Sequence, residues 1–423
     1  MKLNLLGTAL VAVTLTGMGI GQAAAEDVVL SIGSRGYGPT VEKNLQGFKE
    51  ANPDINVEWN KVSDVPNDSR KLYVTSLTAK SPTPDVFAID VIWAGEFAQR
   101  GWLAPLGDLL GADTLATYNQ SLLTAAQIDG KTYAVPLYVD GTHLFYRTDL
   151  LKKYNLEVPK TWEELIADSK TIMKGENNPQ FYGFVSMWAK IEGLFMNWLS
   201  FTNANGGGFY DADGKVAVNS PANIVATQTI VDMIYKDQIA PNSILDMKPD
   251  DARTLFQQGR AAFLMVQDFV YAPLNAADSP VKDKFDFTRN PYFAAHPEGH
   301  STAMGGWFLG VNPNSAHKEA AAKLVKYFTA YDQELAAAVD QNRAPTIPAV
   351  YDDPSMSKAP VLAKLGKDFD VGVVRPSATT GSNYPKVSDI MQLAVTSALH
   401  QQKPVEQALN EAQQQIEALL QAK

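Results

Sequence analysis

Two carboxylates stand where the sequence could support chemistry, because each follows an apolar run and lies close to an aromatic residue. Asp90 is followed by Trp93, and Asp140 lies two residues after Tyr138 and directly before Gly141. Residues two apart in an extended segment point to the same side, so Tyr138 and Asp140 share one face. The neighbouring glycine allows the backbone to bend. This combination suits a ligand-gripping crossover between two lobes, and the alternative is an interior strand that ends in an exposed acid.

The same two acids allow a second interpretation. Paired Asp or Glu side chains hydrolyse glycosidic bonds, one acting as the acid and the other as nucleophile or base. The sequence around Asp90 and Asp140 does not mark either residue as an acid with a raised pKa. A glycosidase therefore stays open as the alternative to a binding protein.

Other kinds of site are not supported by the sequence. The chain has no cysteine, which excludes disulfides, thiolate catalysis and cysteine-ligated metals. His296 and His300 are separated by Pro297 and Gly299, which excludes a metal-binding pair on one helix. The glycines after the first predicted strand lack the spacing of a dinucleotide fingerprint, and no Gly-x-Ser-x-Gly elbow is present. We therefore expect no metal and no cofactor.

Strand and helix patterns alternate in the first part of the chain, which is typical of a mostly parallel sheet. The predicted segments are a strand over 27–32, a helix over 40–49, a strand over 55–60, a helix over 68–80 and a strand over 85–89. Ligands bind outside the carboxyl ends of such strands. The loops at those ends carry Ser34–Tyr37, which includes Arg35, and Asp90–Trp93.

Further along the chain, Thr161 and Glu164 form a capping box that predicts a helix to about Lys174. An apolar stripe after Pro404 predicts a C-terminal helix docked on its own lobe, and a coiled coil with a partner is the alternative. A chain of 423 residues is long for one domain, and its 45% hydrophobic content supplies a large core.

The first 25 residues have the features of an export signal. Lys2 gives a positive start, Leu3–Ile20 is mostly apolar, and small residues lead to a predicted cleavage between Ala25 and Glu26. No cysteine follows for lipid attachment, and no later run is long enough to span a bilayer. The formal net charge of −10 argues against nucleic acid or anionic lipid as a partner.

Three stretches, read in order, carry a resemblance to a known family. They are AVPLYVDGTHLFYRTDLL followed by VPKTWEEL, then FQQGRAAFLM, then MGGWFLGVNPNS. Together they resemble the family 1 extracellular solute-binding proteins, the periplasmic sugar receptors of ABC importers, and the trehalose/maltose-type receptors among them. The resemblance implies an α/β periplasmic binding protein whose two lobes are joined by a three-segment hinge and close on a ligand in the cleft.

The resemblance also implies how the chain is divided. After the signal peptide at 1–25, one lobe would comprise 26–139 and 309–350, and the other 140–308 and 351–423. The crossovers would lie near Val139–Gly141, near Phe308–Gly310 and after the Arg343 region.

The ligand site implied by the resemblance draws on both lobes. Its candidate residues are Arg35, Asp90, Trp93, Tyr138, Asp140, Trp188, Asp268, Phe269, Tyr271, Gly306, Trp307 and Arg375. A sugar has apolar C–H faces and a hydroxyl rim, so aromatic plates and planar charged groups suit it. For Trp93 and Trp188 the core is the alternative place, whereas Trp162 and Trp198 are expected in the core.

The family's acidic residue in the first loop has no clear counterpart in Ser34–Tyr37 of this chain, and Arg35 in that loop could favour an anionic group on the ligand. The resemblance implies a periplasmic, monomeric receptor without a cofactor, which binds a disaccharide, oligosaccharide or glycoside. Its second partner would be the permease subunits of an ABC transporter.

Overall fold

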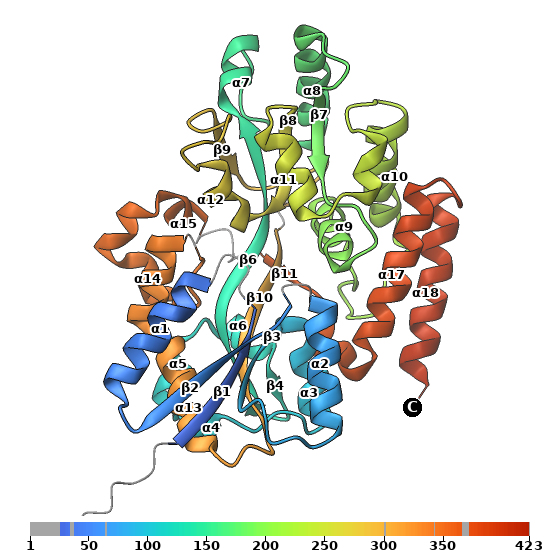
Figure 1. Cartoon of the computed structure of the whole chain (residues 1–423). Coiled ribbons are helices and arrows are strands. Elements are labelled where there is room, and N and C mark those ends of the chain that lie inside the picture. Colours follow the sequence, from blue (N-terminus) through green and yellow to red (C-terminus); the bar gives the residue numbers. More distant parts are fainter. Residues whose placement is uncertain are drawn as a thin grey trace, which may run out of the picture.

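Two α/β lobes lie one above the other in Figure 1, and the long strands β6 and β10 run from one lobe into the other. The computed structural model describes residues 26–33, 38–63, 66–299, 302–341, 343–365 and 372–422. The predicted signal peptide and the loop that contains Arg35 lie outside these residues. We call the lobe that holds β1 the N-terminal lobe and the lobe that holds β7 the C-terminal lobe.

The N-terminal lobe begins as the alternation of strands and helices predicts. Its elements are β1 (Glu26–Ile32), α1 (Gly38–Ala51), β2 (Ile55–Lys61), α2 (Pro66–Thr78) and β3 (Val86–Asp90). The strand β1 lies between β2 and β3 and is parallel to both. All five residues of β3 are buried, as expected for a parallel strand covered on both faces. The predicted parallel sheet is therefore confirmed.

Two long strands connect the lobes. The strand β6 (Ala134–Arg147) pairs antiparallel with β10 (Thr302–Val311) from Ala134 to Gly141 and then with β8 (Ala261–Gln267) from Thr142 onward. The first crossover thus lies where β6 changes partner, next to the predicted Val139–Gly141. Because β10 also pairs with β3, the strands form one sheet in the order β2-β1-β3-β10-β6-β8-β7.

Side chains bridge this change of partner. The hydroxyls of Thr142 and Ser200 lie 2.9 Å apart, and the backbone N–H of Ala303 donates to Ser200 Oγ at 3.0 Å. Asn290 Nδ2 donates to the carbonyl oxygen of Thr142 at 2.8 Å. Side chains therefore supply hydrogen bonds where the backbone pairing of β6 and β10 ends.

The C-terminal lobe packs helices around β7 (Tyr182–Ser186), β8 and β9 (Phe285–Thr288). The helix α8 (Trp162–Glu176) begins at the predicted capping box of Thr161 and Glu164, which is formed. Trp162 stacks on Phe201 with ring centroids 4.0 Å apart. Trp162 and Trp198 are fully buried, so both belong to the core as predicted.

The packing of β10 and η5 bears on where the other two crossings between the lobes lie. Residues after 350 still pack on α14 (Tyr331–Gln341), because η5 (Pro354–Lys358) contacts both α14 and α15 (Pro360–Leu365). The strand β10 pairs with β6 from Met304 onward and with β3 from Trp307 onward. We therefore propose crossings near 302–304 and after 365 in place of the predicted ones at 308–310 and 350.

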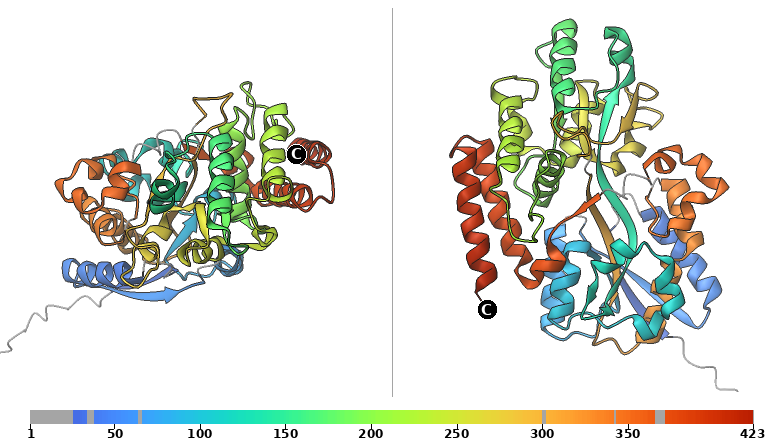
Figure 2. Two further views of the ribbon diagram at one scale, coloured as in Figure 1. Left: turned by 90° about the horizontal axis from the view of Figure 1, so that it is seen from above. Right: turned by 180° about the vertical axis from the view of Figure 1, so that it is seen from behind.

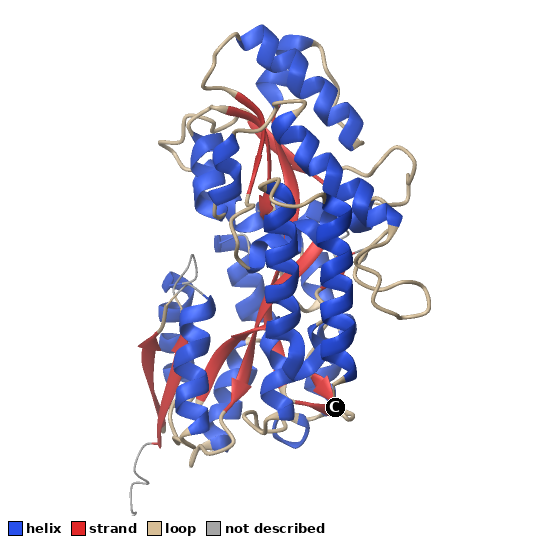
Figure 3. Ribbon diagram, turned by 90° about the vertical axis from the view of Figure 1, so that its right-hand side faces the viewer, coloured by secondary structure: helices blue, strands red, loops and turns tan. Residues whose placement is uncertain are grey.

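The last two helices run along one side of the molecule, beside both lobes (Figures 2 and 3). The helices α17 (Tyr384–Leu399) and α18 (Val405–Gln421) pack on each other, and α17 also packs on α9 (Glu192–Ala204). The strand β11 (Gly372–Val374), which precedes them, pairs with β10. The C-terminal helix thus docks on its own lobe. Within the part of the chain that the structure describes, no helix has the length and apolar character to cross a membrane.

The remaining elements are η1 (Val91–Trp93), α3 (Ala94–Gln99), α4 (Gly107–Leu110), α5 (Ala112–Thr117), α6 (Gln120–Thr124), β4 (Gln127–Ile128), β5 (Lys131–Thr132), α7 (Thr148–Tyr154), α10 (Pro221–Tyr235), η2 (Asn242–Asp246), α11 (Pro249–Gln257), η3 (Asp268–Val270), α12 (Tyr271–Leu274), α13 (Lys318–Phe328), η4 (Pro348–Asp352), α16 (Ser377–Thr380) and η7 (Gly381–Asn383).

Candidate functional site

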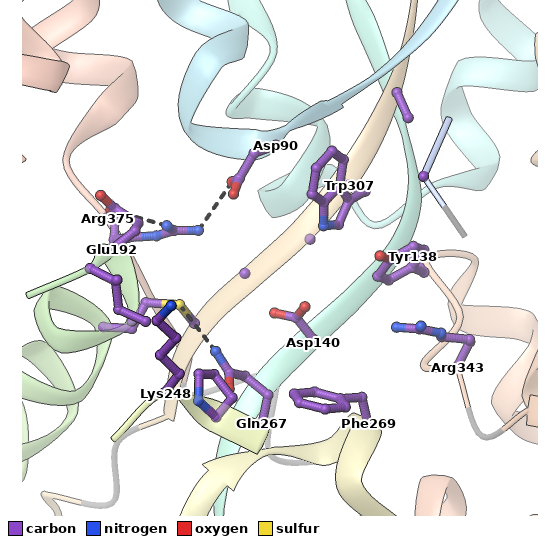
Figure 4. Close-up of a pocket in the computed structure, with 18 of the residues that line it drawn as sticks. Asp90, Tyr138, Asp140, Glu192, Lys248, Gln267, Phe269, Trp307, Arg343 and Arg375 are labelled. Carbon is purple, nitrogen blue, oxygen red and sulfur yellow. Dashed lines mark hydrogen bonds and ion pairs between the residues drawn. The ribbon is translucent and has the colours of Figure 1, made fainter. Parts of the chain in front are cut away.

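A cavity of about 250 Å³ lies between the lobes and is lined from both of them (Figure 4). Seven of the predicted site residues line it: Asp90, Tyr138, Asp140, Phe269, Gly306, Trp307 and Arg375. The other lining residues are Ile32, Gly33, Ser63, Ala88, Ile191, Glu192, Gly193, Met196, Lys248, Pro249, Gln267, Gly305 and Arg343. The strand ends of β3 and β8 both reach this cavity, as expected for ligand sites in α/β sheets.

The sheet register places three of these side chains in one row. Trp307 on β10 lies opposite Asp90 on β3 and opposite Tyr138 on β6. Residues directly opposite each other on neighbouring strands have their side chains on the same face. The row therefore presents an acid, an indole and a phenol side by side to the cavity.

Two glycines on β10 make room for the acid on β6. Gly305 lies opposite Asp140, and a Cβ atom at position 305 would come within 2.2 Å of Asp140 Oδ1. Gly306 has a φ of +157°, and a Cβ there would lie 2.7 Å from the carbonyl oxygen of Tyr138. The Gly-Gly-Trp sequence thus lets Asp140 reach the cavity beside Trp307.

The aromatic residues of the row are supported from behind and from the side. The Trp93 ring meets Trp307 edge-on, with centroids 5.7 Å apart. The guanidinium of Arg343 lies over the Tyr138 ring at 4.5 Å from its centroid, which is cation–π geometry. These contacts hold both rings in place at the cavity wall.

A buried charged cluster forms another wall. Arg375 Nη2 donates to Asp90 Oδ1 at 3.3 Å, and Arg375 Nη1 donates to Glu192 Oε1 at 3.1 Å. Asp90 also accepts from the backbone N–H of Ile92 at 3.2 Å. Burial raises the pKa of Asp90 to about 6, although the Arg375 charge acts in the opposite direction. Nothing in the residues around Asp90 in the sequence indicates this raised pKa.

Glu192 is bound by more groups than Arg375 alone. The hydroxyl of Tyr384 donates to Glu192 Oε1, while Ser388 Oγ at 2.5 Å and Gln392 Nε2 at 3.4 Å donate to Oε2. The donors Tyr384, Ser388 and Gln392 all lie in α17, and Glu192 is the first residue of α9. The cluster therefore joins β3, α9, α17 and the segment that contains Arg375.

A second buried acid organises the segment around Arg343. Glu334 accepts hydrogen bonds from the backbone N–H groups of Thr346 at 2.7 Å and Ile347 at 2.9 Å. Burial raises the pKa of Glu334 to about 8. Val139 forms an isolated bridge with Ala344, next to Arg343. These contacts fix the segment that carries Arg343 over Tyr138.

Two predicted tryptophans belong to the core instead of the cavity wall. Trp93 is 2% exposed and stacks on Phe97, because the short helix η1 turns its side chain into the N-terminal lobe. Trp188 is 1% exposed and packs edge-on against Phe201 in the C-terminal lobe. Among the described residues of the cavity lining, Trp307 is the one whose ring Trp93 contacts.

Two more predicted residues also lie outside the cavity lining. Tyr271 packs against Phe285 and Phe287, since the start of α12 turns it toward β9. Asp268 is buried, and burial together with the nearby Asp140 raises its pKa well above the ordinary value. Arg35 lies outside the described residues.

Several cavity residues escaped the sequence prediction. Gln267 ends the apolar strand β8 just as Asp90 ends β3, so the strand-end rule would have found it. Glu192 and Lys248 begin or precede helices in unremarkable sequence, and nothing there marks them. Arg343 was noted only as part of an irregular segment. Among the described residues, no group of three or more His, Asp or Glu could hold a metal ion.

Comparisons with known proteins agree with this architecture. Residues 33–334 match the family described as bacterial extracellular solute-binding protein. A probable ABC transporter-binding protein of Deinococcus radiodurans is 35% identical over 348 residues, which cover 80% of this chain and 81% of that protein.

Two solved structures are similar over nearly the whole chain. Maltose-bound MalE3 of T. maritima is 34% identical, with a TM-score of 0.86 over 93% of this chain and 100% of that one. An ABC transporter solute-binding protein of Thermotoga lettingae, solved with α-D-tagatose, is 25% identical, with a TM-score of 0.83 over 94% and 100%. The chain therefore belongs to the bacterial extracellular solute-binding proteins, and it is the substrate-binding component of an ABC transporter.

Proposed function

We propose that this chain captures a carbohydrate, namely a disaccharide, an oligosaccharide or a glycoside, and delivers it to the membrane permease. One observation carries the proposal: the register of β3, β10 and β6 aligns Asp90, Trp307 and Tyr138 in one row beside Asp140. An indole and a phenol offer flat apolar faces to sugar C–H groups, and the carboxylates accept hydrogen bonds from hydroxyls. The solved relatives that contain maltose and tagatose support the same ligand class.

The cavity suits a ligand of modest size. Its volume of about 250 Å³ lies just below the range of about 300–1,000 Å³ that is common for small-molecule sites. Phe269 and Met196 add apolar surface from the C-terminal lobe, whereas Gln267 and Lys248 add polar groups. A sugar bound here would contact both lobes and favour their approach.

The alternative is a glycosidase that uses Asp90 and Asp140. The raised pKa of Asp90, about 6, is the observation that fits a general acid. Against it stands the ion pair of Asp90 with the buried Arg375, which occupies the carboxylate without a reacting group. Membership of a family of solute-binding proteins also favours a receptor without catalytic activity.

We extend the proposal to the setting of this receptor. The segment 1–25 would direct export to the periplasm and be removed after Ala25. The mature chain would act as a monomer, bind its sugar between the lobes and present the closed form to the permease subunits.

A ligand screen tests the proposed function. Tryptophan fluorescence and calorimetry should detect binding of at least one member of a panel containing maltose, trehalose, glucose, galactose, tagatose and mannitol. Trp307→Ala should weaken that binding at least about tenfold, or about 1.4 kcal/mol, because the stacking face is lost. Trp102→Ala is the matched control, since Trp102 is a half-buried tryptophan that does not line the cavity.

Chromatography of the same mixtures separates the two functions. The receptor should release unchanged sugar after hours, whereas a hydrolysed product would establish the glycosidase. If no member of the panel binds, the carbohydrate proposal is wrong.

A further inference from the structure

Two cations of the cavity lining, Arg343 and Arg375, are buried. The Arg375 side chain is 2% exposed, whereas Lys248 is exposed at the rim. A buried guanidinium without a counter-charge would attract a carboxylate or a phosphate on the ligand, often in a two-pronged arrangement. The surroundings of Arg375 therefore bear directly on the charge that a ligand can carry.

Two carboxylates already compensate this guanidinium. Asp90 binds Nη2 and Glu192 binds Nη1, one on each side. The Nε atom of Arg375 is buried and has no hydrogen-bond partner in the part of the chain that the structure describes. The Nε–H group of Arg375 therefore remains as a hydrogen-bond donor, while the two carboxylates cancel the positive charge of the guanidinium. Such a donor suits a hydroxyl or ring oxygen better than an anion.

Glu192 holds its position independently of any ligand. The hydroxyls of Tyr384 and Ser388 and the amide of Gln392 all donate to its carboxylate, in addition to Arg375. Four donors surround two oxygens, which fixes both the place and the orientation of the carboxylate. Through this contact Glu192 also sets the direction of the Arg375 guanidinium.

The described cavity lining as a whole is balanced in charge. Its acids are Asp90, Asp140 and Glu192, and its cations are Lys248, Arg343 and Arg375. A ligand anion would have to approach three carboxylates in a partly desolvated space, where like charges repel strongly. Removing one carboxylate would leave the lining with a positive excess.

We propose that Glu192 makes this pocket selective for uncharged sugars: it positions Arg375, cancels its charge and thereby excludes ligands that carry a carboxylate or a phosphate. The inference rests on the proposed carbohydrate function and deepens it. Glu192 acts here as a positioning residue, and Arg375 is the group that would contact the ligand.

Matched pairs of sugars test this selectivity by calorimetry. The pairs are glucose with glucuronate, galactose with galacturonate, and maltose with maltose oxidised to a carboxylate at C6′. The unaltered protein should bind the neutral member of the recognised pair at least about 100-fold more tightly, because the anion meets like charges. This comparison needs no variant, so it stands even if a variant fails to fold.

Glu192→Gln then assigns the effect to one residue. The amide keeps an acceptor for Arg375 but removes the negative charge, so the preference should shrink at least about tenfold, mainly through tighter binding of the uronate. Glu192→Ala should also weaken the neutral sugar, because Arg375 loses its support. Glu176→Gln is the control, since Glu176 pairs with Lys153 at 2.7 Å outside the cavity.

The outcomes separate this inference from the proposed function. Equal or tighter binding of a uronate by the unaltered protein overturns the selectivity, and so does an unchanged preference in Glu192→Gln. A loss of affinity that is the same for both members of a pair indicates a structural role alone and overturns the inference too. Absence of binding by every neutral sugar instead contradicts the carbohydrate function itself.

Discussion

Asp90 combines three roles at one position. It ends β3, it accepts from the Ile92 backbone N–H at the start of η1, and it pairs with Arg375 in the cavity wall. Burial favours the protonated acid, whereas the Arg375 guanidinium favours the carboxylate. Because burial has the larger effect, the pKa of Asp90 is raised to about 6, close to physiological pH.

Sugar affinity should therefore fall in mildly acidic solution. The charged groups around Asp90 are Arg375, Glu192 and Asp140, and the last two raise its pKa together with burial. As a hydroxyl acceptor Asp90 must be ionised, so affinity should be full above pH 7 and decline below pH 6, approaching about tenfold per pH unit. Calorimetry between pH 4.5 and 8 measures this.

Asp90→Asn is the companion variant. It should bind more weakly at neutral pH and lose the acidic decline, because the titrating group is gone. A decline of the same size in this variant would assign the titration to another carboxyl, such as Asp140.

At the scale of single residues, the sequence predicts the cavity lining best where a residue follows a strand or a pair of glycines. It predicts other lining residues less well. Asp90 at a strand end and Trp307 after two glycines both line the cavity. Trp93 and Tyr271 have equally suggestive types and positions, but Trp93 ends the short helix η1 and Tyr271 begins α12, and both rings turn away from the cavity. The sequence does not indicate Glu192 as a site residue, because its role depends on hydrogen-bond partners that are distant in the sequence.

At the scale of elements, β10 organises the site. It pairs with β3 on one side and β6 on the other, so it brings the row of Asp90, Trp307 and Tyr138 into register. Because the glycines of β10 have no side chains, the strand leaves room for Asp140 on the neighbouring strand. The geometry of the site thus depends on the absence of side chains at two positions as much as on the side chains present.

Gly305→Ala should weaken ligand binding more than it weakens the fold. The new methyl group would lie 2.2 Å from Asp140 Oδ1, at the far end of a side chain that can turn away. We expect at least about tenfold lower affinity, or about 1.4 kcal/mol, together with a small change in unfolding free energy. Calorimetry and denaturant unfolding of the same preparation measure both.

Gly310→Ala is the matched control on the same strand. Its methyl group would meet Leu103 Cδ2 at 2.5 Å, away from the cavity lining. This variant should lose stability and keep its affinity. If Gly305→Ala binds normally, Asp140 does not take part in ligand binding in the position described.

The elements themselves were largely predictable, because the strand and helix periodicities of 27–89 and the capping box at Thr161 are local signals. The long strands were harder. The polar turn at Asp140 and Gly141 suggests a break in the sequence, but β6 continues to Arg147. Its continuity depends on new partners in β8 and β9, which local sequence does not encode.

At the scale of the whole molecule, the two lobes share structure. The strands β6 and β10 belong to one sheet that runs through both lobes, and α17 packs on α9 while its start lies near α3. The Arg375 cluster adds ion pairs from the same region to Asp90 and to Glu192. We expect these links to make the two lobes unfold together.

Ligand should therefore stabilise the entire chain in a single step. At a free sugar concentration of 100 times Kd, the unfolding free energy should rise by about 2.7 kcal/mol. Denaturant unfolding followed by tryptophan fluorescence and by circular dichroism should give coincident transitions that shift together. Trp307→Ala at the same sugar concentration should show a smaller shift.

Two separate transitions, of which only one responds to sugar, would contradict this cooperativity.

The division of the chain into two lobes at particular residues came from the family resemblance. The crossings that we propose differ from the predicted boundaries at 308–309 and 350, because the packing of β10 and η5 on which they rest depends on distant segments.

The partnership of β3 with β10 also bears on how the chain is made. These strands are direct neighbours in the sheet, yet one ends at residue 90 and the other begins at residue 302. A ribosome has to synthesise most of the protein before the first lobe can complete its sheet, and such distant pairings form slowly. We expect the growing chain to stay open during that interval, which would suit the proposed export through a translocation channel.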